Sequence, residues 1–209
     1  MNMLHAFGWA ALIILGVYLG LFFWGGVLAA RSAGRSVWLF GAATGKYRWA
    51  AFGFRAAFAM SFAGPLIWLI LPFLHKADPL WTEGGFPLPG LLGVVLSAVG
   101  AMVAFAAQMS MGASWRVGVK AGETGALVQG GLFRFSRNPT FLGQLLMLVG
   151  VALAIPAFPT LAGVALFFWS ASVQIRSEEA ALAASNGDDY RAFQTRVPRW
   201  IGIPGRGTL

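Results

Sequence analysis

Five long apolar runs constrain the fold of this chain more than any other feature of its sequence. Three of them, at about residues 6–30, 52–73 and 88–109, are long enough to cross the roughly 30 Å hydrocarbon layer of a membrane as helices that rise 1.5 Å per residue. The last two, at about residues 141–155 and 160–173, are slightly short for a span and are joined by a brief linker that begins and ends with proline. This spacing predicts a tight helical hairpin, kinked or partly sheltered by protein.

Composition supports an all-α integral membrane protein with about five transmembrane helices and a cytoplasmic C-terminal helical segment. Hydrophobic residues make up 58% of the chain and charged residues only 11%, against roughly 25% charged residues in soluble globular proteins. In the third run, Gly93, Ser97 and Ala101 recur at every fourth position, which allows another helix to approach closely. The chain has no cysteine, and its two histidines, His5 and His75, lie far apart in sequence, so no metal site is expected.

The +8 net charge is distributed between the runs in a way that predicts the membrane orientation. Basic residues gather at residues 31–55, 116–137 and 176–206, whereas the segment between the second and third runs holds a single lysine, Lys76, and no arginine. By the positive-inside rule, the N-terminus lies outside, and the central loop and the C-terminus lie in the cytoplasm. The same distribution argues against nucleic acid as a partner, because the charges sit in short segments between apolar runs.

Residues 130–143 join a polar, glycine-rich loop to the fourth apolar run. Asn138 is a favourable helix N-cap and Pro139 suits the first helical position, so a helix is predicted to begin here. The free N–H groups of its first turn would lie beside Arg134 and Arg137, which predicts an anion-binding site. The alternative is a capped membrane helix whose arginines only mark the cytoplasmic interface. Just before this stretch, the sequence between residues 115 and 129 favours a small β-hairpin.

A pair of carboxylates, Glu178 and Glu179, follows the fifth run. The helix is predicted to continue past them to about Ser185, where Asn186 and Gly187 end it. Acidic groups at a helix C-terminus are unfavourable unless the helix continues or a partner compensates. Beside the arginine-rich turn, the pair would suit a zwitterionic ligand that carries an ammonium and a carboxylate group. A solvated pair at a helix end is the alternative.

Four short motifs at this spacing resemble a known superfamily. They are Arg137-Asn138-Pro139-x-Phe141-x-Gly143, Glu178-Glu179-x-x-Leu182, Gly187-x-x-Tyr190-x-x-Phe193 and Val197-Pro198-Arg199. Together they resemble the isoprenylcysteine carboxyl methyltransferases and phospholipid methyltransferases, which are integral membrane enzymes that use S-adenosylmethionine. The resemblance covers roughly residues 111–203. It implies two parts: residues 1–110 with the first three transmembrane helices, and residues 111–209 as a catalytic methyltransferase half.

The resemblance also assigns roles to residues. The implied catalytic residues are Arg137, Glu178 and Glu179. The implied pocket for S-adenosylmethionine is formed by these three residues together with Asn138, Pro139, Phe141, Gly143, Tyr190 and Arg199. The chain departs from the family at three positions: the family commonly has histidine at Asn138 and tyrosine at Phe141, and prenylcysteine enzymes often have arginine at Gln174. The sequence leaves open whether Arg55, Arg116 or Arg176 contributes to the site.

The implied activity is methyl transfer from S-adenosylmethionine to a lipophilic acceptor at the bilayer, with the carboxylate of a prenylcysteine-like substrate as the first choice. A phospholipid amine or a lipophilic thiol is the second possibility, and a non-catalytic membrane protein is the third. The methyl donor is already activated, so transfer depends mainly on positioning the reactants and excluding water. A carboxylate acceptor needs no general base, whereas an ammonium must first lose a proton, for which Glu178 or Glu179 is the nearest candidate.

Overall fold

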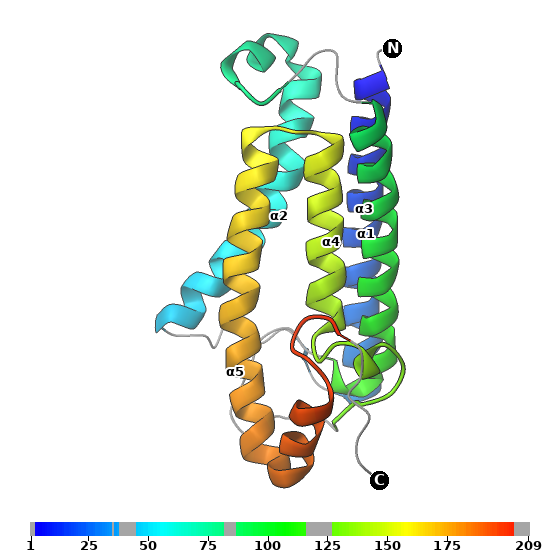
Figure 1. The fold of residues 1–209 in the computed structure, drawn as a ribbon, viewed down its shortest axis with the longest axis vertical. Helices are drawn as coiled ribbons and strands as arrows, with labels where there is room; N and C mark the ends of the chain where they lie inside the picture. The colour runs from blue at the N-terminus through cyan, green and yellow to red at the C-terminus, as the bar shows by residue number, and fades with distance from the viewer. Residues whose placement is uncertain (1–2, 35, 38–44, 82–86, 116–126, 203–209) are drawn as a thin grey trace.

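The structure, a computed structural model, describes residues 3–34, 36–37, 45–81, 87–115 and 127–202. Within these residues the α-helices form one bundle, and the first turns of α1 and the last turns of α5 lie at opposite ends of it (Figure 1). The helices are α1 (Met3–Ala33), α2 (Gly45–Ile70), α3 (Pro87–Met111), α4 (Pro139–Ala154) and α5 (Phe158–Arg196). Short 3-10 helices lie at η2 (Pro72–Ala77), η3 (Gly112–Ser114) and η4 (Gly131–Arg134).

Length and apolarity make α1, α2, α3 and α5 candidate membrane spans. Helix α4 has 16 residues and so rises roughly 24 Å, less than the roughly 30 Å of the hydrocarbon layer. The described part of the chain contains no strand, and the protein is an all-α, multi-pass membrane protein, as predicted. The β-hairpin predicted between residues 115 and 129 falls mainly on residues 116–126, which lie outside the described residues.

The helix boundaries follow the predicted apolar runs with one correction. Helices α1 and α3 contain the first and third runs, and α2 contains the second apart from its last residues. The fifth run is not short as predicted, because it belongs to a helix of 39 residues. Good helix formers such as alanine, leucine and glutamate follow the apolar stretch and carry α5 into the polar tail. The prediction of a helix slightly too short to span the membrane is therefore right for α4 and wrong for α5.

Glycines let α3 and α4 pack with their backbones in contact. A Cβ atom added at Gly93 of α3 would lie 2.6 Å from the carbonyl oxygen of Gly150 of α4. The predicted close-packing face is right at Gly93 and Ser97, which are both buried, but it continues through Gly100, whereas Ala101 is only partly buried. The reason is that a helix turns about 100° per residue, so a buried face alternates steps of three and four residues.

Helix α5 packs mainly on α2, although α4 is its neighbour in the chain. Small residues again permit the contact, because Gly53 of α2 lies against Ser170 of α5. At the end of the bundle where α5 begins, Oδ2 of Asp78 accepts a hydrogen bond of 2.8 Å from the backbone N–H of Phe158. The bundle therefore consists of two groups, α1 with α3 and α4, and α2 with α5.

Aromatic rings fill the space between these two groups. Phe54 of α2 lies 5.4 Å from Phe167 of α5 and 6.4 Å from Phe141 of α4, measured between ring centroids. Tyr18 of α1 stacks on Phe58 of α2 at 6.4 Å. This core brings four helices together beside the N-terminus of α4, where the functional residues predicted from the sequence gather.

Gly187 lets the chain turn back near the end of α5. It has φ 51° and ψ −121°, a conformation that residues with a side chain rarely adopt. It divides α5 into a long helix and a short final segment, residues 188–196 (Figure 1). Tyr190 and Phe193 of that segment pack against Phe133 of η4 in a small second core. The predicted continuation of the helix to about Ser185 and its break at Gly187 are confirmed.

Candidate functional site

Helix α4 begins at Pro139, as predicted, but the side chain of Asn138 does not cap it. The Nδ2 atom of Asn138 instead donates a hydrogen bond of 3.0 Å to the carbonyl oxygen of Arg199. The backbone N–H of Asn138 donates to the hydroxyl of Ser136, also at 3.0 Å. The amide of Asn138 thus holds the C-terminal part of the chain. The side chain of Asn138 therefore makes no cap hydrogen bond to the first turn of α4.

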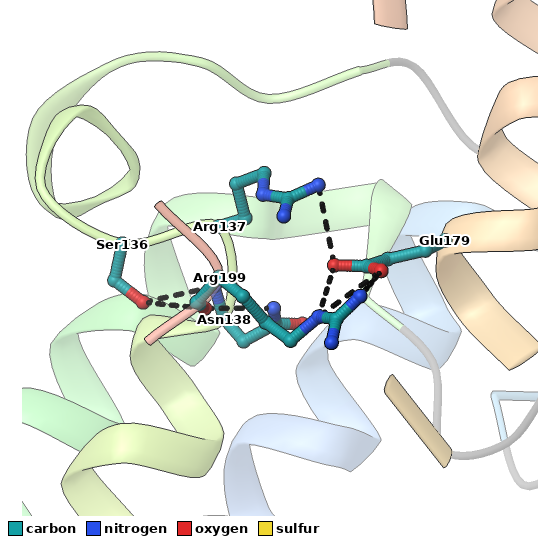
Figure 2. Close-up of polar contacts among 5 residues, drawn as sticks. All are labelled: Ser136, Arg137, Asn138, Glu179 and Arg199. Carbon is teal, nitrogen blue, oxygen red and sulfur yellow. Dashed lines mark hydrogen bonds and ion pairs between the residues drawn. The ribbon is translucent and has the colours of Figure 1, made fainter. Parts of the chain in front are cut away.

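Residues 197–202, here called the C-terminal strap, run across the loop that precedes α4. The backbone N–H of Arg137 donates to the carbonyl of Pro198 at 3.0 Å, and the N–H of Gly202 donates to the carbonyl of Phe135 at 3.2 Å. With the bond from Asn138 to the Arg199 carbonyl, these contacts fix the strap beside the start of α4 (Figure 2).

A buried carboxylate joins two arginines that come from different parts of the chain. Arg199 of the strap donates from Nε to Oε1 of Glu179 at 3.0 Å and from Nη2 to Oε2 at 2.7 Å. Nη1 of Arg137 lies 3.2 Å from the same Oε1 atom. The side chains of Arg137 and Glu179 are 11% and 10% exposed, and that of Arg199 is 42% exposed. Figure 2 shows the two guanidinium groups converging on the carboxylate.

The two ion pairs of Glu179 differ in their contribution to stability because their surroundings differ. Glu179 is buried and the Arg137 side chain is only slightly exposed, and removing the carboxylate of such a pair leaves an unpaired charge at a cost of about 3–5 kcal/mol. Arg199 is partly in solvent, which screens its charge. Even so, its hydrogen bonds to Glu179 raise the pKa of its guanidinium above the ordinary value. The hydroxyl of the buried Tyr190 also contacts Arg137. The cluster therefore ties α5, the loop before α4 and the C-terminal strap together.

The charge cluster of Arg137, Glu179 and Arg199 borders a cavity. Its interior volume is about 90 Å³, and this rises to about 950 Å³ when the space open to solvent is included. Its apolar lining consists of Phe22, Phe54, Met111, Trp115, Leu127, Val128, Phe133, Pro139, Phe141, Leu182 and Tyr190, and its polar lining of Arg137, Asn138, Thr140, Gln144, Gln174, Glu178 and Glu179. Such walls suit a ligand that is partly apolar and partly ionic.

Most of the residues assigned from the sequence line this cavity: Arg137, Asn138, Pro139, Phe141, Glu178, Glu179 and Tyr190. Arg199 contacts the lining residue Glu179 from the C-terminal strap. Gly143 faces α3 instead, where the backbone of Gly100 approaches it. Arg55 and Arg176 are exposed on α2 and α5, and Arg116 lies outside the described residues.

Several lining residues were not assigned from the sequence. Phe22 and Phe54 come from α1 and α2, so helices before residue 111 also form the cavity. Thr140, Gln144 and Gln174 are polar and buried. Polar side chains inside apolar runs are costly and commonly functional. That signal is visible in the sequence at Thr140, which directly precedes the fourth run, and at Gln144 within it.

The fold and the site define a multi-pass helical membrane protein with a partly charged cavity at one end of its bundle. Residues 89–188 match the family described as Phospholipid methyltransferase. The matched family is part of the superfamily of isoprenylcysteine carboxyl methyltransferases and phospholipid methyltransferases that the motifs resemble, and the match covers just under half of the chain. The matched segment contains Arg137 and Glu179 and ends before Tyr190 and Arg199. No curated protein matches the chain significantly.

Proposed function

We propose that the protein transfers the methyl group of S-adenosylmethionine to a lipophilic acceptor at the membrane. The observation that carries this proposal is the cluster of Arg137, Glu179 and Arg199 beside a largely apolar cavity, in a chain whose residues 89–188 match a methyltransferase family. Opposite charges next to aromatic walls suit a cofactor that joins a zwitterionic amino-acid part to a flat heterocycle.

The donors and acceptors of the site fit that cofactor. Arg137 has a buried Nε atom with no hydrogen-bond partner in the described structure, and the first turn of α4 lacks a side-chain cap. Both offer donors to a carboxylate. Glu178 lines the cavity next to Glu179, and the two carboxylates would bind an ammonium group. We assign the remaining pocket walls to Asn138, Pro139, Phe141 and Tyr190, and an indirect role to Gly143, which brings α4 against α3.

The residues of the chain would act by positioning the reactants and excluding water. The bound cofactor supplies a methyl group that is already activated. Arg199, through Glu179, fixes the C-terminal strap over the polar side of the cavity. Phe54 and Phe141 close the side toward the bundle core. A fixed cavity from which bound ligands exclude water lowers the barrier to a displacement reaction by holding the reacting atoms in line.

A carboxylate, as in a prenylcysteine-like substrate, is the first acceptor to test. This acceptor needs no general base, because its oxygen is ionised at neutral pH. An isoprenoid chain would extend along the rings of Phe22 and Phe54, which belong to the apolar part of the lining.

The description of the matched family favours a second acceptor, the amine of a phospholipid. An ammonium group must lose a proton before it attacks the methyl group. Glu178 is the candidate base, because it lines the cavity. A lipophilic thiol would require proton removal in the same way.

We infer that the cavity faces the cytoplasm. Arg137 and Arg199 meet at Glu179 beside the start of α4. The 3-10 helix η2, which contains Lys76, lies at the opposite end of the bundle from the start of α4 (Figure 1). The positive-inside rule then puts the N-terminus outside and the central loop and C-terminus inside. In this arrangement residues 111–209 carry the catalytic groups, and α1 and α2 complete the cavity walls.

The test is transfer of labelled methyl from S-adenosylmethionine by the full-length protein in lipid nanodiscs. One reaction contains a prenylcysteine and another contains phosphatidylethanolamine vesicles, and each product is treated with mild alkali. We expect label on the prenylcysteine that alkali releases, which identifies a methyl ester. Label on lipid that resists alkali would select the amine instead.

Variants connect the activity to the site. Arg137→Ala and Glu179→Ala are expected to reduce transfer at least tenfold while the helical content is retained. Arg176→Ala is the control, because Arg176 is exposed on the same helix as Glu179, and its activity should equal that of the wild type. No transfer to either acceptor, together with no binding of S-adenosylhomocysteine by the wild type, would contradict the proposal and favour a non-catalytic membrane protein.

A further inference from the structure

A second polar group lies in the same cavity. Thr140, Gln144 and Gln174, here called the neutral cluster, are 6%, 2% and 7% exposed, and all three line the cavity. Each keeps a buried polar atom with no hydrogen-bond partner in the described structure, namely Thr140 Oγ1, Gln144 Oε1 and Gln174 Nε2. Unpartnered buried polar atoms are rare in folded proteins and especially costly in a membrane. Three of them around one cavity indicate a ligand.

Helix geometry places Gln144 and Gln174 deeper in the bundle than the charged residues. Thr140 and Gln144 are four residues apart on α4 and therefore share a face, as do Gln174 and Glu178 on α5. Gln174 lies roughly 6 Å before Glu178 along α5, and Gln144 lies roughly 8 Å beyond Pro139, the first residue of α4. The cavity thus passes from charged groups to neutral polar groups within about one to two helical turns.

Tyr18 of α1 holds one member of this cluster in place. Nε2 of Gln144 donates a hydrogen bond of 2.7 Å to the hydroxyl of Tyr18, which is 1% exposed and stacked on Phe58. Because Nε2 is engaged, Oε1 is the atom that remains to accept a hydrogen from a ligand. Tyr18 is therefore a positioning residue, and it comes from a helix before the matched segment 89–188.

We propose that the neutral cluster binds an uncharged part of a ligand that both donates and accepts hydrogen bonds, such as a hydroxyl or an amide. Nε2 of Gln174 donates and Oε1 of Gln144 accepts, while the hydroxyl of Thr140 does either. A carboxylate fits less well, because it has no hydrogen for Gln144 and meets no positive charge among these three side chains. This inference rests on the proposed methyl transfer, since the ligand is its cofactor or its acceptor.

Two sources offer this chemistry. One is the ribose of the cofactor, whose hydroxyls donate and accept. The other is an amide or hydroxyl of the acceptor close to the atom that receives the methyl group. The two sources differ in the constant that a variant changes: the Kd for S-adenosylhomocysteine in the first case, and the KM for the acceptor alone in the second.

The experiment compares Gln174→Met, Gln144→Met and Tyr18→Phe with the wild type, as full-length proteins in nanodiscs. Calorimetry gives the Kd for S-adenosylhomocysteine, and transfer assays give the KM for an N-acetylated prenylcysteine or for phosphatidylethanolamine vesicles, whichever the wild type methylates. Methionine nearly preserves the volume of glutamine and removes its polar atoms. We expect one of the two constants to rise at least about tenfold in both methionine variants, the effect of one lost hydrogen bond in a buried site.

Tyr18→Phe should raise the same constant by a smaller factor, because Gln144 remains but is no longer held. Ser170→Ala is the control. Its hydroxyl is also buried without a partner in the described structure, but it lies against Gly53 of α2 and not in the lining of the cavity. Neither constant should change in Ser170→Ala.

The melting temperature of the ligand-free protein separates a ligand role from a structural one. Gln174→Met should leave it unchanged or raise it, because replacing an unpartnered buried polar atom by an apolar one is neutral or stabilising. Unchanged Kd and KM in both methionine variants would overturn the neutral cluster as a ligand site and leave the proposed methyl transfer intact. A lower melting temperature of Gln174→Met with unchanged constants would overturn it as well. A wild type that binds no S-adenosylhomocysteine would contradict the proposed function itself.

Discussion

The guanidinium of Arg199 contacts both carboxylate oxygens of Glu179, with Nη2 2.7 Å from Oε2 and Nε 3.0 Å from Oε1. Glu179 lies on α5, and Arg199 lies 20 positions later in the C-terminal strap. The two meet because the chain reverses at Gly187. This pair makes the strap part of the wall around the buried carboxylate, beyond the end of the segment that matches the family.

Arg199→Ala is therefore expected to weaken binding of S-adenosylhomocysteine at least tenfold and to loosen the strap. Loss of the guanidinium leaves Glu179 with Arg137 as its remaining ion-pair partner. Calorimetry measures the binding, and hydrogen exchange at the Arg137 and Gly202 amides, which bond across the strap, measures the loosening. Arg191→Ala is the control, because the ion pair of Arg191 with Asp188 is exposed and such pairs contribute little. Wild-type binding by Arg199→Ala would show that the strap is not part of the site.

Substitutions at Asn138 distinguish a helix cap from a donor to the strap. Aspartate is as good an N-cap as asparagine, and alanine is a poor one. The Nδ2 atom of Asn138, however, donates to the carbonyl of Arg199, and aspartate would place an oxygen there. We expect Asn138→Asp to lower the free energy of unfolding by about 1–3 kcal/mol and to be less stable than Asn138→Ala. Chemical unfolding in detergent measures the free energy of unfolding of both variants. A more stable Asn138→Asp than Asn138→Ala would show that Asn138 acts as a helix cap.

The parts of the fold that depend on local sequence are predictable. Apolar runs set the helices, and the Asn138-Pro139 pair correctly marks the start of α4. Gly187 correctly marks the break in α5, because only glycine readily adopts its conformation. The resemblance of short motifs also predicted that Arg137 and Glu179 belong to one site. The two residues are 42 positions apart in sequence and lie in contact.

The parts that depend on packing between distant segments are not predictable in this way. The close packing of α4 on α3 depends on glycines of both helices that lie opposite one another. The hydrogen bond between Tyr18 and Gln144 joins residues 126 positions apart, and no local pattern connects them. Asn138 shows the same limit, because its residue type suits a cap while its actual partner is the carbonyl of Arg199.

The close contact of α3 and α4 predicts a sharp difference between two glycines. A Cβ atom at Gly93 would lie 2.6 Å from backbone atoms of α4, whereas nothing lies within 4 Å of one at Gly20 of α1. Gly93→Ala is expected to lower the free energy of unfolding by about 1–3 kcal/mol through overpacking. Gly20→Ala should be neutral or raise it by up to about 1 kcal/mol, because alanine favours the helix. Equal melting temperatures for the two variants would contradict the packing of α3 on α4.

The contacts of Asp78 predict that its substitution changes the stability of the protein without changing its binding of S-adenosylhomocysteine. Its Oδ2 atom accepts the N–H of Phe158 at the start of α5, its Oδ1 atom accepts the N–H of Leu80, both at 2.8 Å, and the residue is 4% exposed. A side chain that caps a helix in this way contributes about 0.5–2 kcal/mol. Asp78→Ala should therefore lower the free energy of unfolding by that amount. Lys76→Ala is the control, because Lys76 is exposed in the same turn.

The affinity of Asp78→Ala for S-adenosylhomocysteine should equal that of the wild type. The cap lies at the start of α5, and the charge cluster lies more than twenty residues further along the helix, roughly 30 Å away at 1.5 Å per residue. Calorimetry below the melting temperature of the variant measures the affinity. A weaker affinity in Asp78→Ala, with Lys76→Ala unchanged, would mean that α5 moves as a rigid rod and carries a disturbance at its start to Glu179. An unchanged affinity means that the site is held locally, by Arg137, Arg199 and the C-terminal strap.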